Sequence, residues 1–331
     1  MFNTKLLFNP SMYHGFKKRS HYFEGWYYKI VSADKQQVYA ITAGISMGKD
    51  GKKHAFIQIL NGCTNEISYH KFPFHQFWAS SEKFQLTIGN NYFSDDQLLL
   101  LLPSFEGRLL FSNTTPWSSG YTSSEAMRWY AYIPFITYHH RITSLHHNIS
   151  GTLRSADKTS LNFTGGIGYT EKSWGKSLPD TWIWMQSNHF MKQSDNTCLS
   201  ASITQAPWLG TSFISFAIIF WQNGKLYRFS NYSNAKLQII TLENDLIYYN
   251  VSDHSYRLEI TVHKSDYPYF ISPASALTPR HTKEHMMSSL QIALYRLEKG
   301  GKTLIVDDIA THVSLETSGN THELLSSAQN E

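Results

Sequence analysis

The chain has 331 residues, of which 16% are charged, 15% aromatic and 41% hydrophobic. At roughly 150 residues per domain this length suggests two domains, and the composition is that of a folded protein, which excludes a mainly disordered chain. The net charge is +4, and the basic residues are scattered apart from Lys17, Lys18 and Arg19, so a nucleic-acid partner is not expected.

Short runs rich in Val, Ile, Phe, Tyr, Trp and Thr alternate with Asn, Asp, Gly, Ser and Lys, which is the pattern of strands and turns. Helical periodicity is scarce. The predicted strands are, in chain order, 26–31, 38–45, 55–60, 84–88, 97–102, 107–111, 147–153, 182–190, 198–204, 213–221, 257–262, 290–297, 303–307 and 311–315. So many short strands predict an all-β protein of antiparallel barrels or sandwiches with little helix.

The two halves of the chain show an internal echo. Segments 23–30, 38–45 and 56–62 recur in order as 182–190, 198–204 and 216–224, an offset of about 160 residues. Further on, 84–93 followed by 98–102 resembles 247–256 followed by 257–262. We therefore predict two similar β-domains, 1–165 and 166–331, joined near 164–168, where Gly165, Gly166 and Gly168 are expected to loosen the backbone. Chance similarity between generic strands is the alternative.

The cellular location is predicted from the transmembrane, signal-peptide and disulfide patterns that the sequence does not show. The longest strongly apolar run, 213–221, falls short of the roughly 20 residues that a transmembrane helix needs, and residues 1–10 show no secretory-signal pattern. The two cysteines, Cys63 and Cys198, are too few for a disulfide framework. We expect a cytoplasmic protein without a transmembrane segment, and the sequence leaves peripheral contact with a membrane open.

Two stretches, 22–29 and 168–175, each combine a carboxylate with tryptophan and tyrosine. Since alternate residues of a strand share a face, Glu24 is expected to lie with Trp26 and Tyr28. By the same alternation Trp182, Trp184, Gln186 and Asn188 are expected to lie together. We expect one barrel face that holds polar groups among aromatic rings.

Such a face suits acid catalysis. Desolvation raises the pKa of a carboxyl group above its usual value of about 4.3, so that it can donate a proton near neutral pH. Aromatic rings can stabilise a developing carbocation by about 0.5 to 2 kcal/mol per contact. Alternatively, Glu24 and Glu171 pair with Lys29, Lys172 or Arg128, and the tryptophans only fill a core.

The same stretches resemble the tocopherol cyclase family. The resemblance runs through 22–29, the segment Trp-Tyr-Ala-Tyr-Ile-Pro-Phe at 129–135, and 140–151. It is strongest in Glu-Lys-Ser-Trp-Gly at 171–175 with Trp-Ile-Trp-Met-Gln-Ser-Asn-His-Phe at 182–190. The resemblance implies two lipocalin-like (calycin) β-domains and a cofactor-free cyclisation, in which the double bond of a prenylated quinol is protonated and its phenol oxygen closes the ring. Similar two-barrel proteins include isoprenoid hydratases.

The resemblance also suggests roles for individual residues. Glu171 is the expected proton donor, with Glu24 as the second candidate. The expected substrate-binding residues are Trp26, Tyr28, Tyr169, Trp174, Trp184, Gln186 and Asn188, the last two orienting a polar head group. The substrate would be a prenylated quinol or a related isoprenoid. The alternatives are an isoprenoid hydratase and a protein that binds a hydrophobic ligand without chemistry.

Other site classes find little support. The histidine pairs 139–140 and 146–147 lack a matching acidic or cysteine ligand, and adjacent strand residues point to opposite faces, so no metal site is expected. A Ser or Cys nucleophile is not expected either, and 165–168 lacks the spacing of a dinucleotide fingerprint. We expect neither a metal nor another cofactor.

Overall fold

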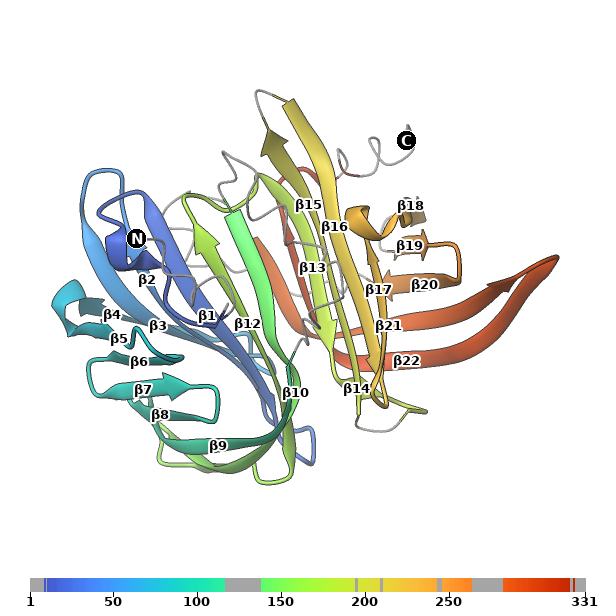
Figure 1. Ribbon diagram of the computed structural model, residues 1–331. Helices are drawn as coiled ribbons and strands as arrows, with labels where there is room; N and C mark the ends of the chain where they lie inside the picture. The colour runs from blue at the N-terminus through green and yellow to red at the C-terminus, as the bar shows by residue number, and fades with distance from the viewer. Residues whose placement is uncertain are drawn as a thin grey trace. The chain divides into compact units, whose positions relative to one another are not determined.

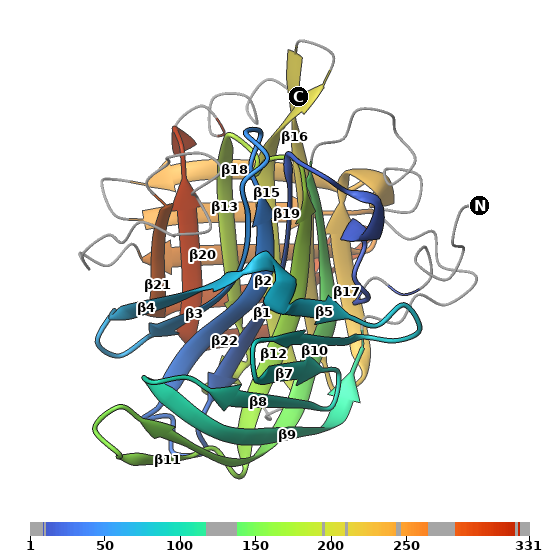
Figure 2. The same ribbon diagram turned by 90° about the vertical axis from the view of Figure 1, so that its left-hand side faces the viewer.

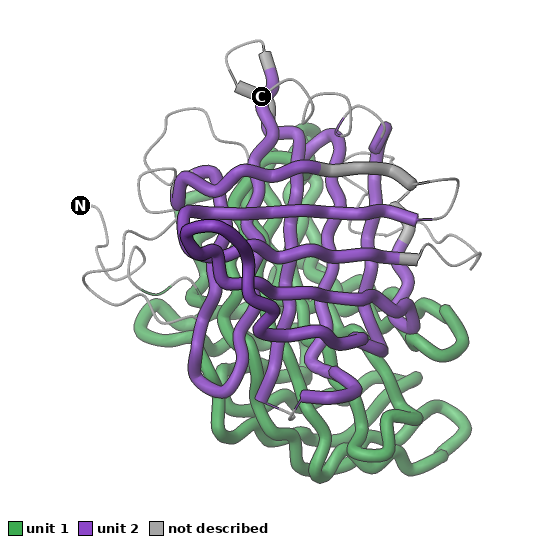
Figure 3. The backbone as a smooth tube through the Cα atoms, turned by 90° about the vertical axis from the view of Figure 1, so that its right-hand side faces the viewer, with its two compact units in different colours: residues 1–118, 137–178, 276–278 green, residues 119–136, 179–275, 279–331 purple. Residues whose placement is uncertain are grey.

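A computed structural model describes residues 9, 11–116, 138–193, 196–208, 211–242, 246–263, 282–321 and 324. These residues form two antiparallel β-sheets with only short 3₁₀ turns between strands (Figure 1), which confirms the predicted all-β class with two lipocalin-like barrels. They fall into two compact units: unit 1 contains the described residues up to Leu178, and unit 2 those from Pro179 onward (Figure 3). The part of the chain that the structure describes contains no helix with the length and apolarity needed to cross a bilayer.

Unit 1 contains a sheet in the order β4-β3-β2-β1-β12-β10-β9-β8-β7-β6-β5, with β11 paired to β10. Its elements are η1 (Gly15–Lys17), β1 (Tyr22–Val31), β2 (Val38–Met47), β3 (Lys53–Asn61), β4 (Ile67–Pro73), η2 (Phe74–Gln76), β5 (Phe77–Ala79), β6 (Gln85–Ile88), β7 (Asn91–Ser94), β8 (Gln97–Leu101), β9 (Phe105–Thr115), β10 (Tyr138–Ser155), β11 (Ser160–Asn162) and β12 (Gly166–Gly175).

Unit 2 contains a sheet in the order β17-β16-β15-β13-β22-β21-β20-β19-β18, with β14 paired to β22. Its elements are β13 (Thr181–Ser187), β14 (His189–Phe190), β15 (Thr197–Trp208), β16 (Thr211–Gln222), β17 (Lys225–Ser230), η4 (Asn231–Ser233), β18 (Lys236–Leu242), β19 (Leu246–Ser252), β20 (Tyr256–His263), β21 (Thr282–Glu298) and β22 (Gly301–Ser318).

Each sheet curls around its own hydrophobic core. In unit 1, Trp26 and Tyr28 of β1 share a buried cluster with Phe93 of β7 and Leu109 of β9, far along the sheet. Figure 2 shows β7, β8 and β9 crossing in front of β1 and β12, as a curled sheet requires. In unit 2 the core contains Ile183 and Met185 of β13 together with residues from β15 to β22. Strand alternation explains both cores, because every second side chain points inward.

The sequence and the structure differ at β22 and β12. The predicted strands 303–307 and 311–315 form one strand, because the polar break at Asp307 and Asp308 stays within β22. There the buried Asp308 carboxylate accepts the backbone N–H groups of Lys192 and Gln193. In addition, the stretch 166–175 is itself a strand, β12, paired with β1 and β10.

Because β12 is part of the first sheet, unit 1 ends at Leu178, whereas the sequence predicts a boundary at residues 165 and 166. The glycines of β12 provide space for neighbours and do not loosen a joint. A Cβ at Gly166 would overlap the carbonyl of Val31, and one at Gly168 would overlap the ring of His147. Gly165 alone occupies a turn with positive φ, +82°.

The internal echo appears in the strand order. The meander β1-β2-β3 continues through β12, β10, β9 and β8, and the meander β13-β15-β16 continues in the same way through β22, β21, β20 and β19. The predicted counterparts of 23–62 in 182–224 are therefore the same strands of the two sheets. The later match is shifted by one strand: by position β20 corresponds to β9, whereas the sequence comparison aligned it with β8.

Candidate functional site

Strands β1 and β12 bring most of the predicted residues together. Their antiparallel register places Glu24 opposite Trp174, Trp26 opposite Lys172, and Tyr27 opposite Glu171. Because side chains alternate, the predicted residues divide between two faces. The core face contains Glu24, Trp26, Tyr28 and Trp174, and the opposite face contains Tyr169 and Glu171. The two candidate acids therefore lie in separate environments.

On the core face, Glu24 is the centre of a buried polar cluster. Its carboxylate is 0% exposed and lies 2.5 Å from Nζ of Lys172, which is also 0% exposed. The Tyr22 hydroxyl donates a hydrogen bond of 2.6 Å to Oε2 of Glu24, and the backbone N–H of His14 donates to both carboxylate oxygens at 2.8 and 3.1 Å. Every donor near this carboxylate thus favours its charged form.

The Lys172 ammonium has several contacts in this cluster besides Glu24. It lies 4.9 Å from the ring centroid of Trp26 and 4.7 Å from that of Trp174, and it donates to the Met12 carbonyl. Burial lowers the pKa of Lys172 to about 8, and the attraction of Glu24 opposes that shift.

For Glu24, burial raises the pKa, but Lys172 and His14 outweigh it and the net pKa is lowered. The expected raised pKa is therefore wrong for Glu24, and the alternative in which it pairs with Lys172 is found. Glu24 is an ionised carboxylate in a closed ion pair.

The N-terminal segment covers this cluster. The Ser11 carbonyl accepts a hydrogen bond of 2.7 Å from the Trp26 indole, and Met12 is 0% exposed. The His14 ring stacks on Trp174 with a centroid distance of 4.6 Å and an interplanar angle of 7°. Trp26 and Tyr28 are core side chains, and their contact with a substrate remains a prediction.

On the opposite face, Glu171 has a histidine partner. Oε2 of Glu171 accepts a hydrogen bond of 2.7 Å from the Tyr169 hydroxyl and lies 2.9 Å from Nε2 of His140, with side-chain exposures of 10% for Glu171 and 14% for His140. The β10–β12 register places His140 opposite Ser173, two residues beyond Glu171 and on the same face. Strand pairing, not sequence spacing, brings these groups together.

Aromatic rings border the pair of Glu171 and His140. Tyr138 stacks on His140 with a centroid distance of 6.4 Å and an interplanar angle of 9°, and its hydroxyl lies 3.0 Å from that of Ser173. Phe23 stacks on Tyr138 at 6.3 Å. The 2.9 Å approach places two groups that can transfer a proton side by side, so the pair is a candidate for general acid–base chemistry.

The remaining predicted residues belong to unit 2. Trp184 and Gln186 alternate along β13 with the core residues Ile183 and Met185, so they lie on the face away from that core. Nε2 of Gln186 donates a hydrogen bond of 2.6 Å to Asn188, whose side chain donates to the Thr197 carbonyl at 3.2 Å. Trp26 therefore faces the core of unit 1, whereas Trp184 lies on the face away from the core of unit 2. The role of the two amides stays a prediction.

His139 and His147, one from each histidine pair, have packing roles. His139 stacks on Trp174 at 5.2 Å, and its pKa is lowered to about 4 by burial and then by the charges of His14 and Arg141. His147 is buried, with Nδ1 2.9 Å from the Ser144 hydroxyl, and burial lowers its pKa to about 3. Among the described residues no three His, Cys, Asp or Glu side chains are placed to share a metal ion.

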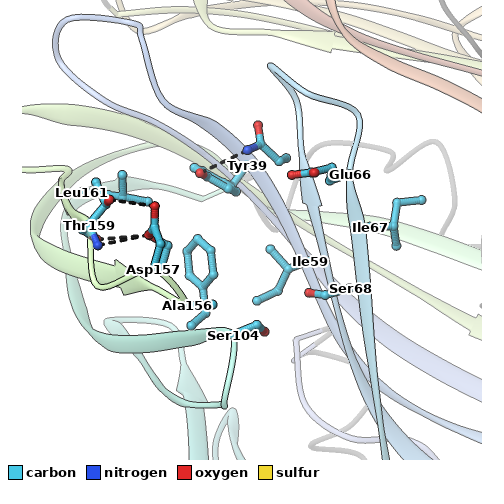
Figure 4. A pocket seen from close by; sticks show the side chains of 13 residues that line it. Tyr39, Ile59, Glu66, Ile67, Ser68, Ser104, Ala156, Asp157, Thr159 and Leu161 are labelled. Atoms are coloured by element: carbon cyan, nitrogen blue, oxygen red, sulfur yellow. Dashed lines mark hydrogen bonds between the residues drawn. The ribbon is translucent and has the colours of Figure 1, made fainter.

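A cavity of about 440 Å³ lies at the end of unit 1 where β1 ends and β2 begins. Figure 4 shows Tyr39, Ile59 and Glu66 around it, with Asp157 held by Thr159. Its lining residues are Tyr39, Ile59, Asn61, Glu66, Ile67, Ser68, Ser104, Phe105, Ser155, Ala156, Asp157, Thr159 and Leu161. None of the residues predicted from the sequence lines this cavity. Its two carboxylates and many hydroxyls suit a polar ligand better than a polyene.

Comparison with solved structures shows which proteins share this fold. Solved structures with a similar fold include a putative AttH from Nitrosomonas europaea, at 12% identity and a TM-score of 0.52 over 90% of this chain and 92% of that one. CghA is similar at 9% identity and 0.53, and CghA with Sch210972 at 9% and 0.51, each over 90% of this chain and 88% of the other. These likenesses show the fold alone.

Among curated proteins, none matches the chain. The segment 129–135, which contributed to the sequence resemblance, lies outside the described residues. A family described as tocopherol cyclase-like matches residues 110–319, which is more than half of the chain. The protein therefore belongs to the tocopherol cyclase-like family.

Proposed function

We propose that this protein is an enzyme that cyclises a prenylated quinol or a related isoprenoid by proton transfer, with Glu171 and His140 as the acid–base pair and without a cofactor. The observation that supports the proposal most is the 2.9 Å approach of His140 Nε2 to Glu171 Oε2, beside aromatic rings on the non-core face of β12. Membership of the tocopherol cyclase-like family supports the same class of reaction.

The reaction balances with the protein's own groups. The His140–Glu171 pair gives one proton to the substrate double bond, which leaves a tertiary carbocation. The phenol oxygen of the substrate then forms a bond to that carbon, and its proton returns to the pair. Substrate and product are isomers, so no oxidant, reductant or metal is consumed. The ring faces of Tyr138 and Phe23 can stabilise the cation by about 0.5 to 2 kcal/mol per contact.

Glu24 serves a different purpose in this proposal. Its carboxylate is already ionised and paired with Lys172, so it has no proton to give near neutral pH. The pair stabilises the core face of β1 and β12 and takes no part in the proton transfer. A protein of the same fold, CghA, has been crystallised with Sch210972, which supports a small-molecule ligand for this chain.

The test is turnover of a panel of prenylated quinols by purified Glu171→Gln and His140→Gln variants. Each substitution keeps the side-chain size and removes the group that transfers the proton, so kcat should fall by about 10² or more while KM changes little. In D₂O the wild type should place one deuteron on the protonated carbon. Glu106→Gln is the control, because Glu106 is an exposed carboxylate paired with Arg154 at 2.9 Å in the same unit.

The turnover test distinguishes the proposed cyclase from the alternatives. Wild-type kcat in folded Glu171→Gln would refute the role of Glu171. A product that has gained one water would identify a hydratase. If the wild type binds the panel but converts none of it, the protein is a carrier of a hydrophobic ligand and the catalytic proposal fails.

A further inference from the structure

Unit 1 presents exposed cations at the end of its sheet where β1 begins. We call the group the basic patch: it consists of Lys17, Lys18, Arg19, Lys49 and Lys176, all exposed. Lys18 extends back along β1, with Nζ 5.6 Å from the ring centroid of Tyr22. These residues come from three separate parts of the chain.

The contacts of His21 show that these parts meet. Its backbone N–H donates a hydrogen bond of 3.2 Å to the Gly48 carbonyl, which joins the start of β1 to the turn between β2 and β3. Burial lowers the pKa of His21, and the charges of Lys49 and Lys176 lower it further, as expected when both ammonium groups are near. The neighbouring acid Asp50 is paired with Lys52 at 3.2 Å.

Two large aromatic side chains of unit 1 are exposed, one just before the basic patch in the chain and one on β5. Phe16 on η1 is 42% exposed, and Trp78 on β5 is 54% exposed. Tyr13 links the two elements, since its ring packs edge-on against Phe16 at 4.7 Å and against Phe77, the residue before Trp78, at 5.0 Å. Aromatic rings beside lysines are typical of surfaces that settle at the headgroup level of a bilayer.

We propose that the basic patch, with Phe16 and Trp78, docks the protein on the surface of an anionic lipid bilayer. Each Lys or Arg close to such a surface contributes about a fivefold gain in partitioning. The cations come from three parts of the chain that meet at the start of β1, and they do not form the extended stripe that follows a nucleic-acid backbone. A docked protein would meet substrates that dissolve in the bilayer, but the docking itself does not depend on the proposed reaction.

The test is co-sedimentation of the full chain with vesicles, without any substrate. The wild type should bind phosphatidylglycerol-containing vesicles at about 0.02 M salt, bind pure phosphatidylcholine vesicles much more weakly, and be released at about 0.5 M salt, because the screening length shortens. The variant Lys17→Gln/Lys18→Gln/Arg19→Gln should partition about 10²-fold more weakly. Phe16→Ser should weaken partitioning several-fold at unchanged charge.

A matched control removes the same charge at the other end of the strands. Lys35 lies in the turn between β1 and β2, Lys158 between β10 and β11, and Arg154 near the end of β10. Replacing these three by Gln should leave vesicle binding within about twofold. Equal losses in the control would overturn the patch as the docking site. Binding to duplex DNA but not to anionic vesicles would identify nucleic acid, and not a lipid surface, as the partner of the basic patch. Turnover measurements test the proposed reaction and not the docking.

Discussion

The ion pair between Glu24 and Lys172 allows a quantitative prediction. Lys172→Met keeps most of the apolar stem but removes the ammonium group, which leaves the Glu24 carboxylate 0% exposed with only Tyr22 and His14 to stabilise it. Breaking a buried pair by removing one partner costs about 3 to 5 kcal/mol in the free energy of unfolding. For a domain of this size, about 2 to 4 °C per kcal/mol gives a fall in Tm of about 6 to 20 °C.

Urea unfolding, followed by tryptophan fluorescence, measures this loss. The double variant Glu24→Gln/Lys172→Met removes both charges, so it should be more stable than the sum of the single effects predicts, with a coupling energy of about 2 kcal/mol or more.

The pH dependence of the contribution of Glu24 to stability has a defined sign. Because the folded pKa of Glu24 is lowered, its contribution is complete above the unfolded value of 4.5 and is lost as the pH falls through the folded pKa. Glu24→Gln should remove that part of the acid sensitivity.

Two results would refute the reasoning. The first is a loss below about 1 kcal/mol in Lys172→Met, which is the level of an exposed pair. The second is additivity of the two single substitutions, which would mean that the carboxylate and the ammonium do not depend on each other.

Three further predictions concern packing, pH and metal. Gly168→Ala places a methyl group against the His147 ring and should cost about 1 to 3 kcal/mol in urea unfolding, whereas Gly25→Ala, whose Cβ would meet Thr42 Cγ2 at 3.6 Å, should cost less. His147 is neutral in the folded state, with a pKa of about 3, and the unfolded chain takes up its proton below about 6.5, so stability falls as the pH falls. Between pH 7 and pH 5 His147→Gln should lose about 2 kcal/mol less than wild type. Dialysis against EDTA should leave turnover unchanged, and restoration of lost activity by zinc would require a metal site.

The strand pattern of the sequence predicts most of the strands of the fold, because the alternation of apolar and polar residues is a local property of the chain. Glu24, Trp26 and Tyr28 do share a face, as their spacing predicts. The predicted boundary at residues 165 and 166 stays a prediction, whereas Gly166 and Gly168 accommodate Val31 and His147, which are distant in the sequence. A glycine that provides space for a neighbour and one that loosens a loop look identical in a sequence.

The same limit applies to the candidate site. The motif around Glu171 is visible in the sequence, but its partner His140 depends on the register between β10 and β12, which contains bulges. No spacing rule connects the two residues. The sequence left the partner of Glu24 open among Lys29, Lys172 and Arg128. Only the register, with Trp26 opposite Lys172, places that ammonium beside Glu24 on the core face.

The adjacent residues Glu171 and Lys172 of β12 are expected to have different roles, Glu171 in turnover and Lys172 in stability. Lys172 points to the core and neutralises Glu24, while Glu171 points to the other face and contacts His140. The two substitutions should therefore have opposite signatures. Lys172→Met should lower the unfolding free energy while the folded fraction still turns over, and Glu171→Gln should lower turnover at nearly wild-type stability. If both substitutions lowered stability alone, β12 would be purely structural and the acid–base role would have to move to another part of the protein.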